Sequence, residues 1–134
     1  MKQLLLKDTR NDSLLRLSSL EYTPNSEDHF RFIVSFESPG ANVTRRVDDH
    51  YLERWSNFFS GVAECWRGWQ GVKACSSTGE SFGVSLVSDT LGHIEMRLAL
   101  CSPDVPSSWT FNGTLVIEAG QLEKIARDAS AFFA

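Results

Sequence analysis

The chain has 134 residues, of which 42% are hydrophobic and 22% are charged, and its formal net charge is −4. This length and composition predict one soluble globular domain over residues 1–134, large enough to bury a hydrophobic core. The mild acidity and the lack of a clustered basic patch argue against nucleic-acid binding, and no apolar run is long enough to span a membrane.

The first part of the chain predicts strands joined by polar turns. The clearest strand covers residues 29–37, in which every second residue from Phe30 to Phe36 is large and apolar. Alternation with a period of two places these side chains on one face, which must be a core face. Further strands are expected over residues 2–7, 12–22 and 42–48.

One long helix is expected in the middle of the chain, over residues 49–67. Asp49 is expected to cap its first turn, and Gly68 is expected to end it. Apolar residues recur every three or four positions and form one broad stripe, which is typical of a helix that covers a sheet. The stripe consists of Tyr51, Leu52, Trp55, Phe58, Phe59, Val62, Ala63 and Trp66.

After the helix the pattern returns to a period of two. Strands are expected over residues 71–77, 81–88, 93–101 and 109–118, and a second amphipathic helix over residues 121–133. Turn-forming residues separate consecutive strands, which favours antiparallel pairing. The sequence therefore predicts an α+β fold, with an antiparallel sheet of seven or eight strands packed by two helices.

Trp66, Arg67 and Trp69 lie close together at the end of the central helix. Tryptophan and arginine are enriched among the residues that dominate protein interfaces, so this segment is a candidate partner-binding site. A structural interpretation competes with it. Trp66 would complete the apolar stripe of the helix, which is the favoured interpretation for this residue, and Trp69 would pack beneath the next strand. Both interpretations stay open for Trp69.

His93 and Glu95 share the polar face of one predicted strand with Arg97. Together with Asp49, His93 and Glu95 are a candidate polar site, because imidazole and carboxylate groups can transfer protons. Alternating polar residues are also typical of a strand face that meets solvent, and this interpretation is favoured.

Sequence motifs of several enzyme and metal-binding classes are missing. The chain has no GxSxG elbow, P-loop or GxGxxG motif. The three histidines lack the close spacing of a metal site, so neither a metal nor a cofactor is expected. Cys65, Cys75 and Cys101 form no CxxC pair. An odd number of separated cysteines without a secretory signal indicates reduced thiols in a cytoplasmic protein.

Several motifs occur together between about residue 28 and the C-terminus. They are WRGW at 66–69, LGHI at 91–94, the strand SSWTFNGTLVIEAG around Trp109, and LEKIA at 122–126. This combination resembles an uncharacterised bacterial family of small single-domain proteins. The resemblance implies a bacterial origin and no catalytic residues, since that family has no assigned activity. The chain is also similar in general style, but not in motif, to bacterial immunity proteins, which are small, acidic, cytoplasmic α+β domains.

Two hypotheses for the function follow. In the first, the chain is a non-enzymatic protein-binding module, of an immunity or antitoxin type, that binds a basic partner through Trp69, Arg67 and Trp66. In the second, it is a small-ligand-binding protein or an enzyme, with a pocket between sheet and helix near His93, Glu95 and Asp49. A homodimer formed through a strand edge or the Trp69 region is a third possibility.

Overall fold

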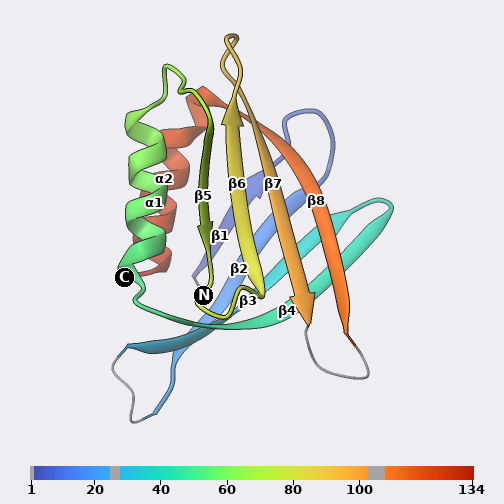
Figure 1. The fold of residues 1–134 in the computed structure, drawn as a ribbon, viewed down its shortest axis with the longest axis vertical. Coiled ribbons are helices and arrows are strands. Elements are labelled where there is room, and N and C mark those ends of the chain that lie inside the picture. Colours follow the sequence, from blue (N-terminus) through green and yellow to red (C-terminus); the bar gives the residue numbers. More distant parts are fainter. Residues whose placement is uncertain (1, 25–27, 103–107) are drawn as a thin grey trace.

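The computed structural model describes residues 2–24, 28–102 and 108–134. Over these residues the chain forms eight strands, two α-helices and one short 3-10 helix (Figure 1). In chain order they are β1 (Gln3–Lys7), β2 (Leu14–Tyr22), β3 (His29–Ser38), β4 (Ala41–His50), α1 (Glu53–Glu64), β5 (Val72–Ser76), β6 (Phe82–Ser88), β7 (His93–Ser102), β8 (Trp109–Glu118), η1 (Ala119–Gln121) and α2 (Leu122–Phe132).

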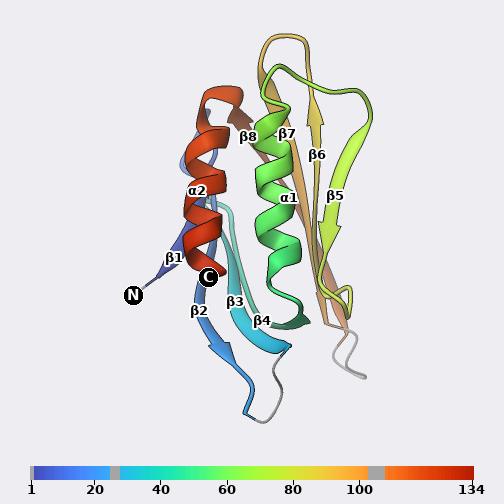
Figure 2. The same ribbon diagram turned by 90° about the vertical axis from the view of Figure 1, so that its left-hand side faces the viewer.

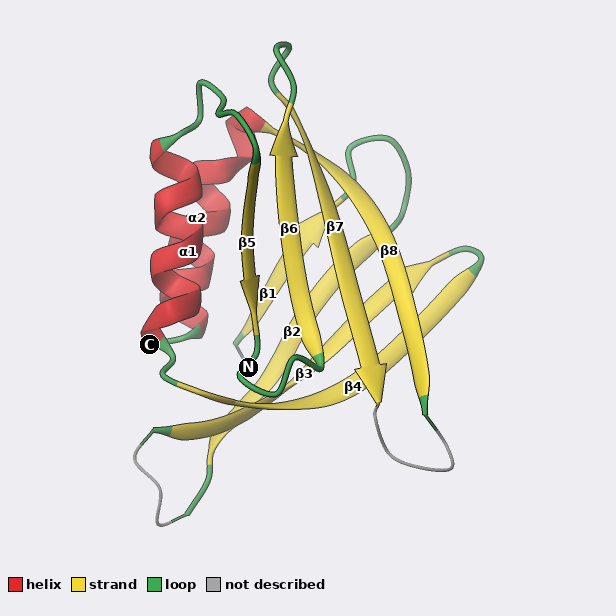
Figure 3. Cartoon of the chain, in the orientation of Figure 1, coloured by secondary structure: helices red, strands yellow, loops and turns green. Residues whose placement is uncertain are grey.

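The strands form two antiparallel sheets of four strands each, in the orders β1-β2-β3-β4 and β5-β6-β7-β8. The predicted α+β class and antiparallel pairing are confirmed, but the described strands are divided between two sheets instead of one. Each sheet is a meander followed by a helix, so the same order of elements occurs twice (Figure 3). Hydrophobic alternation shows which face of a strand is buried, but it does not show whether β4 and β5 pair across the intervening helix.

The two sheets lie face to face with their strands crossing, and the helices stand side by side along one side of them (Figures 1 and 2). Helices α1 and α2 run in opposite directions and pack on each other. Helix α1 also contacts β5, and α2 contacts β1, so each helix covers the edge strand of a different sheet. Each apolar face is thereby buried against another element.

Aromatic side chains join the two sheets and the two helices. Trp55 of α1 stacks on Phe82 of β6 with 5.3 Å between ring centres. Phe133, just after α2, meets Phe32 of β3 edge to face at 5.9 Å. Trp55 and Phe32 have no exposed surface. Trp55 also stacks on Phe133 at 6.3 Å, so the rings form one cluster, and the loss of any of them would leave a cavity in the core.

The central helix starts later than the sequence predicts. Helix α1 begins at Glu53, because β4 continues its pairing with β3 until His50 lies opposite His29. Tyr51 then takes a positive φ of 62°, which turns the chain out of the strand. The predicted helix-capping role of Asp49 is therefore wrong. Asp49 and His50 remain paired with β3 in the antiparallel ladder, so the first turn of the helix does not form at these residues.

The central helix also ends earlier, at Glu64 instead of Arg67. The amide of Cys65 donates to the carbonyl of Val62, and the amide of Gly68 donates to the carbonyl of Cys65 at 2.8 Å. The chain therefore leaves the helix in a tight turn. Gly68 has a φ of 110°, which glycine adopts without strain. It closes this turn and does not cap the helix.

Candidate functional site

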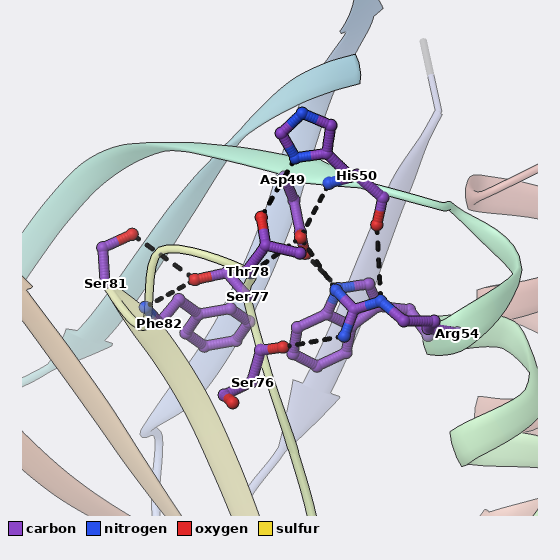
Figure 4. Close-up of polar contacts among 9 residues, drawn as sticks. Asp49, His50, Arg54, Ser76, Ser77, Thr78, Ser81 and Phe82 are labelled. Atoms are coloured by element: carbon purple, nitrogen blue, oxygen red, sulfur yellow. Dashed lines mark hydrogen bonds and ion pairs between the residues drawn. The ribbon is translucent and has the colours of Figure 1, made fainter. Parts of the chain in front are cut away.

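Asp49 lies at the centre of a polar cluster that joins β4, α1 and the turn between β5 and β6 (Figure 4). Its side chain is completely buried. One carboxylate oxygen accepts hydrogen bonds from the Arg54 guanidinium at 2.8 Å and from the amides of His50 and Thr78 at 2.8 and 2.9 Å. The other oxygen accepts one from the Trp55 indole at 2.7 Å. Four internal donors satisfy this carboxylate, so it acts as a structural junction.

Arg54 extends this junction to β5. Its guanidinium donates to the carbonyl of Ser76 at 3.0 Å and to the carbonyl of His50 at 3.3 Å, in addition to its ion pair with Asp49. The positive charge offsets the cost of burying the carboxylate. The junction therefore holds the connection between β4 and α1 against the second sheet.

His93 begins β7, and its imidazole lies between two carboxylates. Nδ1 is 3.0 Å from Oδ2 of Asp89, and Nε2 is 3.6 Å from Oε1 of Glu118. Asp89 also accepts hydrogen bonds from the amides of His93 and Leu91, at 2.9 and 2.7 Å. These bonds, the one from the His93 amide above all, hold the pKa of Asp89 below its ordinary value. The Asp89 carboxylate thus organises the turn between β6 and β7.

The structure does not bring Asp49 to His93 and Glu95. The junction around Asp49 contacts the turn before β6, whereas His93 follows β6, and this strand of seven residues spans roughly 23 Å. His93 and Glu95 do share one face, and they line an open hollow of about 410 Å³ together with Arg10. Their side chains are 46% and 42% exposed. Glu95 pairs with Arg97 at 3.3 Å, as on other solvent-facing strands.

Trp66 lies beyond the end of α1, and its side chain is exposed. It keeps 55% of its surface open to solvent, so the expectation that it completes the apolar stripe is wrong. The reason is that the helix ends at Glu64, which takes Trp66 off the helical face. The guanidinium carbon of the neighbouring Arg67, itself exposed, lies 5.0 Å from the centre of a Trp66 ring.

Of the two tryptophans in the WRGW segment, Trp69 is the one that packs. It is partly buried against the core, and its indole Nε1 donates to the carbonyl of Leu86 in β6 at 3.4 Å. The ammonium group of Lys73 lies 5.6 Å from the ring centre. Trp69 therefore fastens the segment between α1 and β5 to the second sheet, while Trp66 points to solvent.

Trp66 forms part of a hollow of about 590 Å³ where the end of α1 meets the start of α2. Figure 2 shows these two helix ends side by side at the top of the molecule. The hollow is lined by Ala63, Glu64, Trp66, Ala119, Gly120 and Glu123, and we call these six residues the Trp66 surface. Its members are an exposed indole, three small residues and two carboxylates.

The sequence indicates Trp66 but not its surroundings. Ala63 and Glu64 end one helix, whereas Gly120 and Glu123 belong to the start of another, far later in the chain. Only the antiparallel packing of α1 on α2 brings them together. One local signal was present: Glu64 is an acidic residue in a last helical turn that contains no basic residue, where lysine or arginine is favoured.

The sequence matches the model of a family of unknown function, DUF6228, over residues 6–134. The chain belongs to this family. The match confirms the predicted resemblance to an uncharacterised family, whereas the bacterial origin stays a prediction. A comparison with proteins whose descriptions are curated gave no match. Membership of DUF6228 assigns no catalytic or binding residue.

The DUF6228 chain has a further, broader hollow of about 890 Å³ beside the edge strand β5. Arg54 and Phe58 of α1 line it, together with small residues of the sheet such as Ala74 and Gly83, and with Arg97 of β7. Its described lining residues include no histidine, aspartate or glutamate. The hollow therefore contains cationic groups but no pair of side chains suited to proton transfer near neutral pH.

The cysteine thiols lie apart. Cys65, Cys75 and Cys101 are free, and burial raises the pKa of the Cys75 thiol to about 11. Cys75 is therefore a poor nucleophile at neutral pH. Among the residues that the structure describes, no group of three or more histidine, cysteine, aspartate or glutamate side chains could hold a metal ion. No described helix combines the length and the hydrophobicity needed to cross a membrane.

Proposed function

We propose that this protein is a non-enzymatic protein-binding module, and that it binds its partner through the Trp66 surface. One observation carries the proposal: the half-exposed indole of Trp66 borders a hollow of about 590 Å³ between two helix ends. When a partner covers a large aromatic side chain, the buried apolar surface stabilises the complex. Tryptophans of this kind are enriched among the residues that dominate binding.

The three residues of the WRGW segment that the sequence indicates have different roles in this proposal. Trp66 is the central contact. Arg67, exposed beside it, contributes to the rim of the interface. Trp69 holds the segment in place through its contact with Leu86 and does not itself meet the partner.

A more specific form of the proposal is an immunity- or antitoxin-like role in the bacterial cytoplasm. In this role a small acidic protein binds and neutralises a basic partner. The net charge of −4 supports it, because opposite charges accelerate association and favour the correct partner.

The alternative is a small-ligand-binding protein or enzyme with a pocket between sheet and helix. Its support is the hollow beside β5, where Arg97, whose ion pair with Glu95 is exposed, would favour an anionic ligand. The charge of Arg54, which also lines this hollow, is already offset by Asp49. The absence of an acid–base pair among the described lining residues favours binding over catalysis. Asp49, His93 and Glu95 do not line this hollow.

The test compares two exposed aromatic residues of equal exposure. Trp66 is 55% exposed and Tyr22, at the end of β2, is 54% exposed. We expect the tagged wild-type protein and its Tyr22→Ala variant to capture one stoichiometric partner from the native lysate, and the Trp66→Ala variant to lose it. Purified components then give the affinity, which we expect to fall at least tenfold, as for a central interface residue.

Two results would contradict the proposal. The first is a Trp66→Ala variant that binds the partner with wild-type affinity, which would place the site elsewhere. The second is the absence of a protein partner together with a thermal shift by small anions that Arg97→Ala abolishes, which would favour the ligand-binding alternative. Sedimentation of the purified protein identifies the case in which the partner is a second copy of the chain.

A further inference from the structure

We infer that the Trp66 surface accepts a basic side chain, an arginine or lysine of the partner, which lies against the Trp66 indole between the carboxylates of Glu64 and Glu123. This inference rests on the proposed function and adds the chemistry of the partner. It follows from the charge, the helix-end position and the shape of the hollow.

The charge of the hollow is the first argument. Its described lining residues include two carboxylates and no lysine or arginine. Glu64 and Glu123 are exposed, and neither forms an ion pair with any described residue. Glu37, by contrast, pairs with Arg16 at 2.8 Å. A cation from outside the chain would supply the missing counter-charge.

The position of Glu64 is the second argument. It is the last residue of α1, and the last turn of this helix contains no basic residue. The C-terminal end of a helix carries partial negative charge, so a carboxylate there is unfavourable in the free protein. A residue that breaks a local rule without compensation within the fold is typical of a functional site. Glu123, in the first turn of α2, occupies a favourable position and breaks no rule.

The indole is the third argument. A cation over a tryptophan ring is attracted by the negative face of the ring. The guanidinium of Arg67 lies 5.0 Å from the centre of a Trp66 ring, so this exposed indole already attracts a group of this kind. Arg67 is not among the residues that line the hollow. The incoming cation therefore meets the part of the indole that Arg67 leaves free.

The small residues of the hollow are the fourth argument. Ala63, Ala119 and Gly120 leave room for the methylene groups of a long basic side chain. A Cβ atom added at Gly120 would meet no atom within 4 Å, and its φ is not in the left-handed region. A larger side chain at this position therefore meets open space and does not disturb the fold. Because Gly120 lines the hollow, we use Gly120→Leu as the variant that adds bulk at its wall.

The test uses the full chain labelled with ¹⁵N and the peptide acetyl-Gly-Arg-Gly-amide as the probe. The same peptide with citrulline, which is neutral and nearly identical in shape, is the control. We expect the arginine peptide to shift the Trp66 indole resonance in a saturable way, with a dissociation constant on the order of ten millimolar. The citrulline peptide should cause no saturable shift. Equal shifts from both peptides, or no saturation with either, would overturn the inference.

Charge-matched double variants provide the second arm of the test. Glu64→Gln/Glu123→Gln removes two charges at the hollow, whereas Glu53→Gln/Glu80→Gln removes two exposed charges elsewhere. We expect the first pair to weaken arginine-peptide binding at least fivefold and the second pair to leave it within about twofold. Equal losses of affinity in the two double variants would show that the effect depends only on net charge, and this result would refute the site.

Gly120→Leu is expected to abolish the saturable shift while the melting temperature stays that of wild type. Glu64→Gln alone should raise the melting temperature by about 2 °C, because it removes the unfavourable helix-end charge. If Glu64 instead stabilises the fold, Glu64→Gln would lower the melting temperature, and this result would count against the inference.

The two proposals fail in different ways. If the captured partner depends on Trp66 but binds Glu64→Gln/Glu123→Gln as tightly as wild type, the binding module stands and the basic-residue inference is wrong. If Trp66→Ala keeps the partner, the proposed function is wrong, whatever the peptides show.

Discussion

At the scale of single residues, Asp49 is a buried charge whose hydrogen bonds are all made within the described chain. Its carboxylate has four donors from three elements and no exposed surface. Every one of these bonds is made within the chain, so no substrate or partner is needed to explain the charge. A buried carboxylate without such donors would be strongly destabilising, so the burial of Asp49 depends on these four hydrogen bonds.

The change Asp49→Asn should lower the free energy of unfolding by about 3 kcal/mol, because it leaves the Arg54 charge without its partner and presents an amide to backbone donors. Urea denaturation measures this value. The neighbouring Asp48 is the control: it is 57% exposed and its contacts with His29 and Arg31 are 3.5 and 4.0 Å long. Asp48→Asn should cost less than about 1 kcal/mol. Similar losses of unfolding free energy for both variants would show that Asp49 has no special structural role.

At the scale of elements, the connection between α1 and β5 determines the environments of Trp66 and Trp69. The two tryptophans of this connection are three positions apart and have opposite environments, because the helix ends at Glu64 and the chain turns at Gly68. Trp69 is left to cover the second sheet, and Trp66 is left on the surface beside the start of α2. The boundary of this helix therefore decides which of the two tryptophans is exposed.

Trp69→Ala should lower the free energy of unfolding by about 2 kcal/mol, since it removes a partly buried ring and a hydrogen bond. Trp66→Ala should change it by less than about 0.5 kcal/mol, because most surface substitutions have small effects. Thermal and urea unfolding give both values under the same conditions. A larger loss for Trp66→Ala than for Trp69→Ala would reverse the assignment of the two residues and would remove the basis for the Trp66 surface.

At the scale of the whole molecule, the two sheets are tied together near the N-terminus. Asp8, after β1, accepts a hydrogen bond from the amide of Val116 in β8 at 2.9 Å, and the amide of Thr9 donates to the carbonyl of Val116 at 3.0 Å. Arg10 completes the arrangement with an ion pair to Asp8 at 3.0 Å. Burial alone would raise the pKa of Asp8, but the hydrogen bonds from Arg10 and Val116 outweigh it and lower this pKa from its ordinary value of 3.8.

This shift predicts a pH dependence of stability. Because the pKa of Asp8 is lower in the folded chain than in the unfolded chain, the stabilisation is complete above 3.8 and is lost as the pH falls through the lower folded value. Asp8→Asn should therefore be less stable than wild type at pH 7, and the difference should shrink below pH 3.8. Urea midpoints measured from pH 7 down to acid test this, and a constant difference would show that ionisation of Asp8 does not stabilise the fold.

The sequence by itself determined the α+β class, the alternation of the strands and the position of the second helix, because the spacing of apolar residues reports directly on local backbone geometry. Of the proposed site, the sequence indicated Trp66 and Arg67 through the enrichment of tryptophan and arginine at interfaces, although it favoured a packed Trp66. Only the tertiary structure decided that the strands form two sheets, that Asp49 is buried in a junction and that Trp66 is exposed while Trp69 packs. It also brought Glu64 and Glu123 to one hollow. These features depend on pairing and packing between segments far apart in the chain, and local periodicity contains no information about which distant surfaces meet.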